Sequence, residues 1–309
     1  MNDNLISSAP PHIHTKDSSR RIMLDVVLAL VPACIASVIL YGLKALLILL
    51  VCTASSVLAE ACFNALVKKS QTIGDLSAAV TGILLGLNLS TNAALWQCVI
   101  GSVFAIVFVK CMFGGLGHNF ANPAISGRVF MLIAFSSVAG GAAPAMIDAV
   151  SSATPLQTLA SGTAAGLPSL GQMFLGMRGG AIGEGCILAL LLGYAYLVLR
   201  RVVKWYLPVI FIGTVFALCL FSSGSFTHAL YEILAGGLFL GAIFMATDYV
   251  TTPITARGRM LFALGCGVLT FLIRRFTAYP EGVSFSILAM NLLSHWLENI
   301  SAKKPLGGA

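Results

Sequence analysis

The chain of 309 residues is 58% hydrophobic and only 9% charged. Soluble domains carry about 25% charged residues, so this composition excludes a water-soluble protein and predicts an integral membrane protein. The formal charge of +7 does not indicate a nucleic-acid partner, because in a membrane protein the positions of the basic residues matter more than their sum.

Ten continuous apolar runs follow a polar start that lacks the pattern of a cleavable signal peptide. Most approach the ~20 residues that a helix needs to cross a bilayer, and none alternates as a membrane β-strand does. The runs cover roughly residues 22–42, 45–67, 76–92, 94–113, 121–139, 181–199, 203–222, 229–246, 259–273 and 282–298. They predict an all-α membrane protein of about ten transmembrane helices.

A polar segment at 140–180, rich in Gly, Ser, Thr and Ala, divides these runs into two sets of five. The predicted organisation is a tail at 1–21, a five-helix repeat at 22–139, a loop at 140–180, a second five-helix repeat at 181–299 and a tail at 300–309.

The basic residues predict the orientation. With ten spans both termini share one side, and thirteen Lys and Arg residues lie there, against four on the other side and Arg128 within a span. Because positive charge is retained in the cytoplasm, both termini are expected to be cytoplasmic. The loop at 140–180 then faces outward.

The two halves contain a similar pattern. Gly82-Ile-Leu-Leu-Gly86 and Gly237-Leu-Phe-Leu-Gly241 each precede a polar stretch. An odd number of spans per half would place the second half inverted in the membrane, and matching interrupted segments then indicate a site near the midplane. The alternative is that both patterns are unrelated small-residue contacts between helices.

Polar breaks interrupt the apolar runs at 114–124 and 247–255. Lipid cannot satisfy free backbone groups, so such breaks are covered by protein or line a cavity. Their polar side chains are Asn119, Asn122, Thr247, Asp248, Thr251 and Thr252. They either cap half-helices or bind a ligand lodged between the breaks, where helix N-termini present free N–H groups.

Ionisable residues within spans are rare and usually functional. The candidates here are Asp25, Glu60, Arg128, Glu184 and Glu232. Arg128 could pair with Glu184 or with a phosphate. The eight cysteines contain no C-x-x-C pair and are interpreted as small packing residues. No metal-ligand spacing appears, so no metal is expected.

The central loop contains a recognisable motif. Asp148-x-x-Ser151-x-Ala153-Thr154 resembles the flavinylation motif of the RnfD/NqrB family, Asp-x-x-Ser/Thr-Gly-Ala-Thr, with Ser152 where Gly is usual. Three other stretches resemble that family: Gly114–Ala124, Met245-Ala-Thr-Asp-Tyr-Val-Thr-Thr-Pro253 and Tyr279-Pro-Glu-Gly282. The short polar start is more similar to the RnfD branch.

The resemblance implies a bundle of two inverted five-helix repeats, similar in architecture to urea transporters, in the cytoplasmic (inner) membrane. It implies one subunit of a complex that moves electrons between ferredoxin and NAD and translocates Na⁺ or H⁺. The implied partners are RnfA, RnfB, RnfC, RnfE and RnfG, the lipid bilayer, and a flavin transferase during maturation. No complete active site is expected in this chain alone.

Two flavins are implied by the same resemblance. FMN would be esterified through its phosphate to Thr154, within the motif that also contains Asp148, Ser151 and Ala153. A non-covalent riboflavin is expected near Asn119, Asn122 and Asp248. The alternatives are a quinone-reducing sodium-pump subunit of the NqrB type, a urea-transporter-like channel without flavin, and a structural scaffold.

Overall fold

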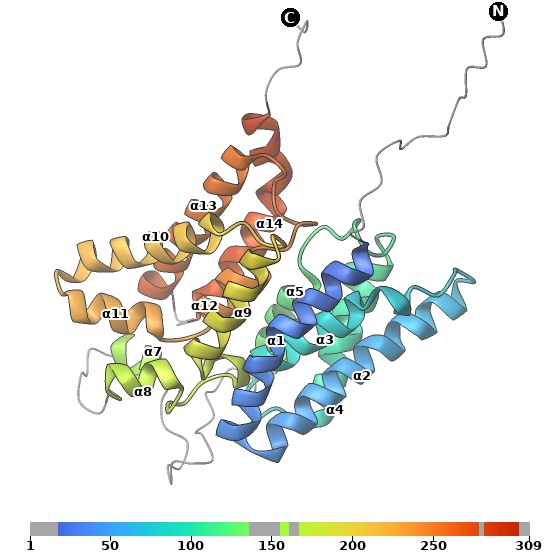
Figure 1. Cartoon of the computed structure of the whole chain (residues 1–309), viewed down its shortest axis with the longest axis horizontal. Coiled ribbons are helices and arrows are strands. Elements are labelled where there is room, and N and C mark those ends of the chain that lie inside the picture. Colours follow the sequence, from blue (N-terminus) through green and yellow to red (C-terminus); the bar gives the residue numbers. More distant parts are fainter. Residues whose placement is uncertain (1–17, 136–154, 161–166, 278–280, 303–309) are drawn as a thin grey trace, which may run out of the picture.

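The computed structural model describes residues 18–135, 155–160, 167–277 and 281–302. This part of the chain is built of α-helices with short 3₁₀ and π segments, and no β-strand occurs in it. The predicted all-α class is therefore confirmed. Figure 1 shows two groups of helices, α1–α5 and α9–α14, with the short helices α7 and α8 beside α11.

The first group contains two long helices followed by shorter ones. Its elements are α1 (Ser19–Tyr41), α2 (Leu43–Leu66), η1 (Ile73–Asp75), α3 (Ser77–Asn88), α4 (Leu95–Val103), the π segment η2 (Phe104–Cys111) and α5 (Pro123–Ala134). Helix α4 continues directly into η2, and α5 begins at a proline, which suits the first turn of a helix because that position needs no N–H donor.

The second group follows two short helices. Its elements are α7 (Pro155–Ala160), α8 (Leu170–Leu175), η3 (Ile182–Glu184), α9 (Ile187–Leu199), α10 (Tyr206–Ser223), α11 (Phe226–Leu234), α12 (Leu238–Leu240), the π segment η4 (Gly241–Met245), α13 (Ala256–Phe276) and α14 (Gly282–Ser301).

Four helices in the described part are long and apolar enough to cross a membrane, namely α1, α2, α10 and α13. A fifth span results if α11 and the α12–η4 segment are counted together, although they are bent by 65°. Shorter apolar helices of 10–17 residues cover 77–88, 95–111, 123–134 and 187–199. The chain is thus a multi-pass helical membrane protein, and its ten spans remain a prediction.

Two predicted runs differ from the observed helices. The run at 229–246 is broken rather than straight, because Gly236 has φ +70, a left-handed conformation that glycine adopts readily. The run at 181–199 begins with the 3₁₀ turn η3, and α9 starts only at Ile187.

The repeated glycines are packing contacts. A Cβ at Gly82 would lie 2.6 Å from the Cα of Thr53, and one at Gly86 would lie 3.1 Å from the Leu49 side chain, so both glycines hold α3 against α2. Gly241 similarly admits Val283 of α14, whose Cγ1 lies 2.5 Å from such a Cβ. Small-residue helix contacts, the alternative explanation of this pattern, therefore occur in both halves.

Candidate functional site

The two halves meet at the ends of interrupted helices. Asn122 caps α5, since its Oδ1 accepts hydrogen bonds from the N–H groups of Ala124 and Ile125 at 3.0 and 3.3 Å. Its Nδ2 donates across the molecule to the carbonyl oxygen of Met245, at 3.3 Å. Asn88 at the end of α3 also reaches Met245, with its Nδ2 3.5 Å from the sulfur. Capping of half-helices, as considered from the sequence, is confirmed here.

The second break is organised by Asp248. Its carboxylate accepts hydrogen bonds from the Val250 N–H at 3.1 Å and from the Thr251 hydroxyl at 3.3 Å, and its carbonyl accepts one from Thr252. Burial raises the pKa of the Asp248 carboxyl, while the donors from Val250 and Thr251 lower it. These bonds hold the carboxylate in a tight turn directly after η4.

A single cavity, the central cleft, is lined by residues of both breaks. Asn119, Asn122 and Asp248 all border it, so three residues proposed together from sequence do lie together. Its enclosed volume is about 80 Å³. Other polar residues on its wall are Ser77, Thr81, Lys110, Thr247 and Tyr249. Amide, carboxylate and hydroxyl groups in this number can bind a polar ligand with several hydrogen-bonding edges.

Lys110 also lines the central cleft, although the sequence analysis did not predict it as a site residue. Its ammonium group donates to Glu60 Oε1 at 2.9 Å and to Ser77 Oγ at 2.6 Å, and both charged side chains are 2% exposed. Glu60 also accepts a hydrogen bond from Thr72 at 2.7 Å. A lysine at the end of an apolar run predicts an interfacial charge, so no sequence signal distinguished this buried pair.

Buried charges also join the two halves. Arg128 on α5 forms ion pairs with Glu184, at 3.7 Å, and with Glu281 before α14. Arg178 donates to the carbonyl of Glu184 at 2.8 Å. The possible pairing of Arg128 with Glu184 is thus confirmed, whereas Glu281 was not anticipated as a partner.

The remaining ionisable candidates form peripheral pairs. Asp25 lies 3.1 Å from Arg200 and accepts a hydrogen bond from Tyr196 at 2.9 Å. Glu232 lies 3.6 Å from Arg274. Of the cysteines, Cys52, Cys98, Cys111, Cys219 and Cys266 are buried and free.

The proposed flavinylation motif, with Asp148, Ser151, Ala153 and Thr154, lies outside the described residues. The structure begins again at Pro155, the first residue of α7. Leu156 and Leu159 of that helix pack with Met173 and Ala235. The chain directly after the motif is therefore fixed against α8 and α11.

Comparison with known proteins places the chain in a family. A family model described as "NQR2, RnfD, RnfE family" matches residues 6–307. The chain is 43% identical over 311 residues to the D subunit of the Na⁺-translocating ferredoxin:NAD⁺ oxidoreductase complex of Acetobacterium woodii, covering 99% of this chain and 97% of the relative.

Two further relatives agree. The chain is 38% identical to the D subunit of the proton-translocating ferredoxin:NAD⁺ oxidoreductase complex of Clostridium ljungdahlii, covering 97% of this chain and 95% of the relative. It is 34% identical to the D subunit of the ion-translocating oxidoreductase complex of Escherichia coli, covering 92% and 93%. The match extends over both halves and both polar breaks, and the chain belongs to the NQR2, RnfD, RnfE family.

Proposed function

We propose that this chain is the flavin-carrying membrane D subunit of an Rnf-type complex, which couples electron transfer between ferredoxin and NAD to Na⁺ or H⁺ translocation. The observation that carries the proposal is the near-complete alignment with the D subunits of two ferredoxin:NAD⁺ oxidoreductase complexes. Their names favour this role over quinone reduction. The chain acts within an oxidoreductase and translocase, with RnfA, RnfB, RnfC, RnfE and RnfG as its partners.

The proposed architecture is two inverted five-helix repeats in the inner membrane, as in urea transporters. Helices α1 and α9 start the two halves and run in opposite directions, because Asp25 pairs with Tyr196 while Ser37 donates to the carbonyl of Ile182. The interrupted helices α3 and α12–η4 hold matching third places and meet at Met245. This geometry supports inversion.

The first proposed cofactor is FMN, joined through its phosphate to Thr154. A bound flavin supplies reversible electron transfer, while the protein supplies position and electrostatics. A covalent tether also removes the entropic cost of capturing the cofactor at each turnover. A flavin transferase on the outer side of the membrane would attach the FMN to Thr154. After that attachment, Thr154 itself has no further role.

The covalent flavin is tested by Thr154→Ala. The variant should insert and assemble normally but show no flavin fluorescence in a denaturing gel, where only covalently attached cofactor is retained. Mass spectrometry of the peptide containing Thr154 should show FMN on the unsubstituted chain alone. A fluorescent band of full strength in the variant would exclude Thr154 as the acceptor. Absence of a band from the unsubstituted chain would leave a flavin-free channel as a competing function.

The second proposed cofactor is a non-covalent riboflavin in the central cleft. Asn119, Asn122 and Asp248 supply amide and carboxylate groups that suit the polar edge of a flavin. The cleft of about 80 Å³ is smaller than the ~300 Å³ at which ligand pockets usually begin. Binding therefore requires side chains at its mouth to move, and Tyr249, which is 46% exposed, has the room to do so.

A further inference from the structure

A groove opens on the second half of the molecule, where Figure 1 shows α9, α10, α11 and α12 together. These helices and η4 line a volume of about 450 Å³, here called the α10 groove. Its lining includes Leu191, Val209, Phe216, Leu230, Phe239 and Ile243. Val209 is 52% exposed, whereas Ile243 is 1% exposed. The groove therefore reaches from the surface of the span α10 into the helix bundle.

The lining of the α10 groove is apolar. It consists of aliphatic and aromatic side chains, Pro208 and Gly213. Tyr194 contributes the one side-chain hydroxyl among the described lining residues, and this hydroxyl already donates to the carbonyl of Trp205 at 2.5 Å. Burying a polar group without a partner is costly, so the groove suits a wholly apolar chain and does not suit a polar ring.

Gly213 keeps the α10 groove open in its middle. Glycine within a helix costs ~1 kcal/mol relative to alanine. A Cβ added at Gly213 would have no atom within 4 Å, so no close approach in the described part of the chain requires glycine at this position. The missing side chain leaves space between Val209 and Phe216, both of which line the groove.

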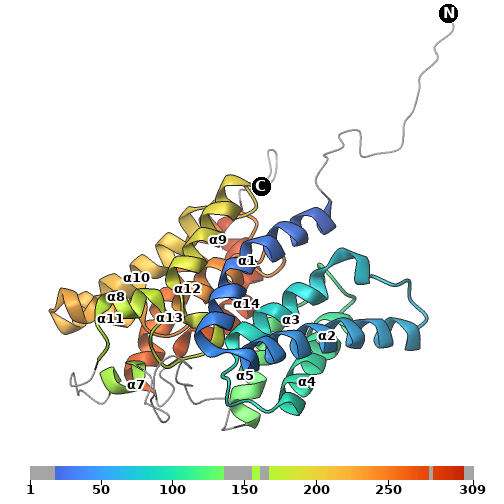
Figure 2. The same cartoon turned by 60° about the horizontal axis from the view of Figure 1, so that its bottom comes forward.

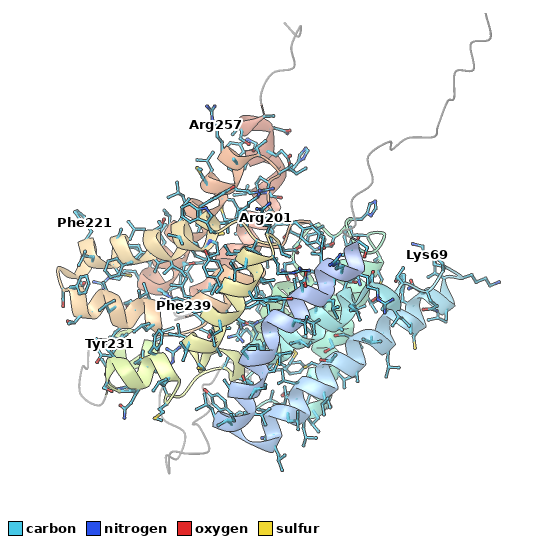
Figure 3. All side chains as sticks on the ribbon, viewed as in Figure 1. Lys69, Arg201, Phe221, Tyr231, Phe239 and Arg257 are labelled. Carbon is cyan, nitrogen blue, oxygen red and sulfur yellow. The ribbon has the colours of Figure 1, made fainter. Side chains whose placement is uncertain are left out.

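Positive charge lies where α10 begins. Arg201 and Lys204, in the loop between α9 and α10, are both exposed and form no ion pair within the described residues. The hydrogen bond from Tyr194 to the Trp205 carbonyl fixes the end of this loop against the groove. Figure 3 labels Arg201 at the end of α9 and Phe239, a lining residue, farther along the same part of the molecule.

Two cations beside an apolar groove match a molecule with an anionic head and an apolar chain. Basic residues at a membrane surface attract anionic lipid headgroups. A transmembrane helix is a cylinder roughly 10–12 Å wide and 30 Å long, which has several times the volume of the groove. An acyl chain is only one carbon wide, so the groove can enclose it.

We propose that the α10 groove is a binding site for an anionic phospholipid. One acyl chain lies in the groove, and Arg201 and Lys204 hold the phosphate of the headgroup. Trp205, which is 62% exposed, lies at the level of the headgroups, where tryptophan is enriched in membrane proteins.

The headgroup contacts are tested by Arg201→Gly combined with Lys204→Gln. Arg201 has φ +59 and ends α9, with its N–H bonded to the Val198 carbonyl and the Val202 N–H bonded to the Leu197 carbonyl, each at 3.0 Å. Glycine is the residue preferred at this position of a helix end. The substitution therefore removes the charge without damaging α9.

Lys68→Gly combined with Lys69→Gln is the matched control. Lys68 has φ +57 and ends α2 with equivalent bonds, from its own N–H to the Ala65 carbonyl and from the Lys69 N–H to the Asn64 carbonyl. Both lysines are exposed. Helix α2 does not line the α10 groove, so this control removes the same charge from a helix end without the groove.

The acyl-chain contact is tested by Gly213→Leu, which fills the groove. Ala217→Leu is its control, because Ala217 is exposed on the same helix but does not line the groove. Both variants add apolar volume to α10. Only the first should displace a bound chain.

Native mass spectrometry of the full-length chain in detergent measures binding of phosphatidylglycerol and of phosphatidylcholine with the same acyl chains. The unsubstituted chain should bind one phosphatidylglycerol with a preference of roughly thirtyfold, the value for two basic residues. The Arg201/Lys204 variant should lose this preference. Gly213→Leu should weaken binding of both lipids severalfold, and both controls should match the unsubstituted chain.

Equal binding of the two lipids by the unsubstituted chain would overturn the proposal and leave only a general lipid coat. Equal losses in a variant and its control would overturn it as well. In the complex isolated from the membrane, one phosphatidylglycerol should remain bound unless the chain carries Gly213→Leu. Absence of that lipid from the unsubstituted complex would overturn the proposal, and loss of a subunit caused by Gly213→Leu would assign the groove to a helix of a partner.

Discussion

Lys110 shows how much a single buried charge depends on its partners. Lys110 of η2 donates to Glu60 Oε1 of α2 and to Ser77, and Glu60 Oε1 also accepts a hydrogen bond from Thr72, whereas Glu60 Oε2 has no hydrogen-bond partner in the described part of the chain. Breaking such a pair leaves an uncompensated buried charge, whereas replacing both members by neutral groups is often tolerated. The pair joins η2 to α2 at this point.

Lys110→Met should destabilise the protein by ~3–5 kcal/mol, because Glu60 stays buried without a cation. The double variant Lys110→Met with Glu60→Gln should recover most of the loss. Thermal denaturation in detergent measures both. Lys69→Met, at an exposed position labelled in Figure 3, should have little effect. Equal losses in the single and double variants would contradict the role of the ion pair.

Asn122 performs two tasks that substitutions can separate. Asn122→Asp keeps the cap of α5 but loses the donor to Met245, whereas Asn122→Ala loses both. We expect Ala to cost ~1 kcal/mol more than Asp in stability, the usual value of an N-cap. Both should reduce the non-covalent flavin released on denaturation, measured by chromatography. Full flavin content in both variants would remove Asn122 from the proposed site.

Residues of the site could be predicted from the sequence where a motif contained them. Asn119, Asn122 and Asp248 were grouped from two breaks and do line one cleft. Glu281 and Lys110 were not predicted as site residues, because each pairs with a residue more than 40 positions away. Such pairs form only when helices pack together, and a local sequence pattern does not contain that information. The motif around Thr154 stays a prediction.

The bend between α11 and α12 is the feature of an individual element that most affects the packing of α7. The hydropathy of residues 229–246 predicts one straight span, because hydropathy depends on composition alone. It therefore cannot predict the 65° bend between α11 and the α12–η4 segment. The adjacent glycines Gly236 and Gly237 were the available signal, because positive φ favours glycine. The bend also creates the surface on which Leu156 rests.

Gly236→Ala should separate α7 from this corner. The new Cβ would meet Leu156 at 2.5 Å in addition to the strain of φ +70, and such strain alone costs ~1–3 kcal/mol. Gly224→Ala is the matched control, since Gly224 has φ +63 but no atom within 4 Å of its added Cβ. Proteolysis near α7 should accelerate only in the Gly236 variant. Equal rates in both would attribute the effect to backbone strain.

For the whole molecule, the ends of the described chain lie apart from α7. Figure 2 shows the start of α1 towards one end and α7 towards the other. This separation agrees with the charge distribution, which predicts cytoplasmic termini and an outward central loop. The all-α class could be predicted from hydropathy. The ten spans stay a prediction, because several helices in the described part of the chain are shorter than a bilayer is thick.

Orientation can be tested with two cysteines placed in open positions. Neither Gly74 nor Gly171 has an atom within 4 Å of an added Cβ, and both are exposed. In a Cys62→Ser background, a membrane-impermeant maleimide applied to intact cells should label Gly171→Cys but reach Gly74→Cys only after permeabilisation. The reverse pattern would invert the proposed topology.

The contacts between the halves have a consequence for biosynthesis. Arg128 and Asn122 emerge from the ribosome well before Glu184, Met245 and Glu281, with which they pair in the folded chain. Until the second half is translated, the Arg128 guanidinium and the Asn122 side-chain N–H lack the partners that they have in the folded chain. Such unpaired polar groups are costly inside a membrane. A chain arrested between the halves would therefore be a natural target for membrane quality-control proteases, and only complete translation would end that vulnerability.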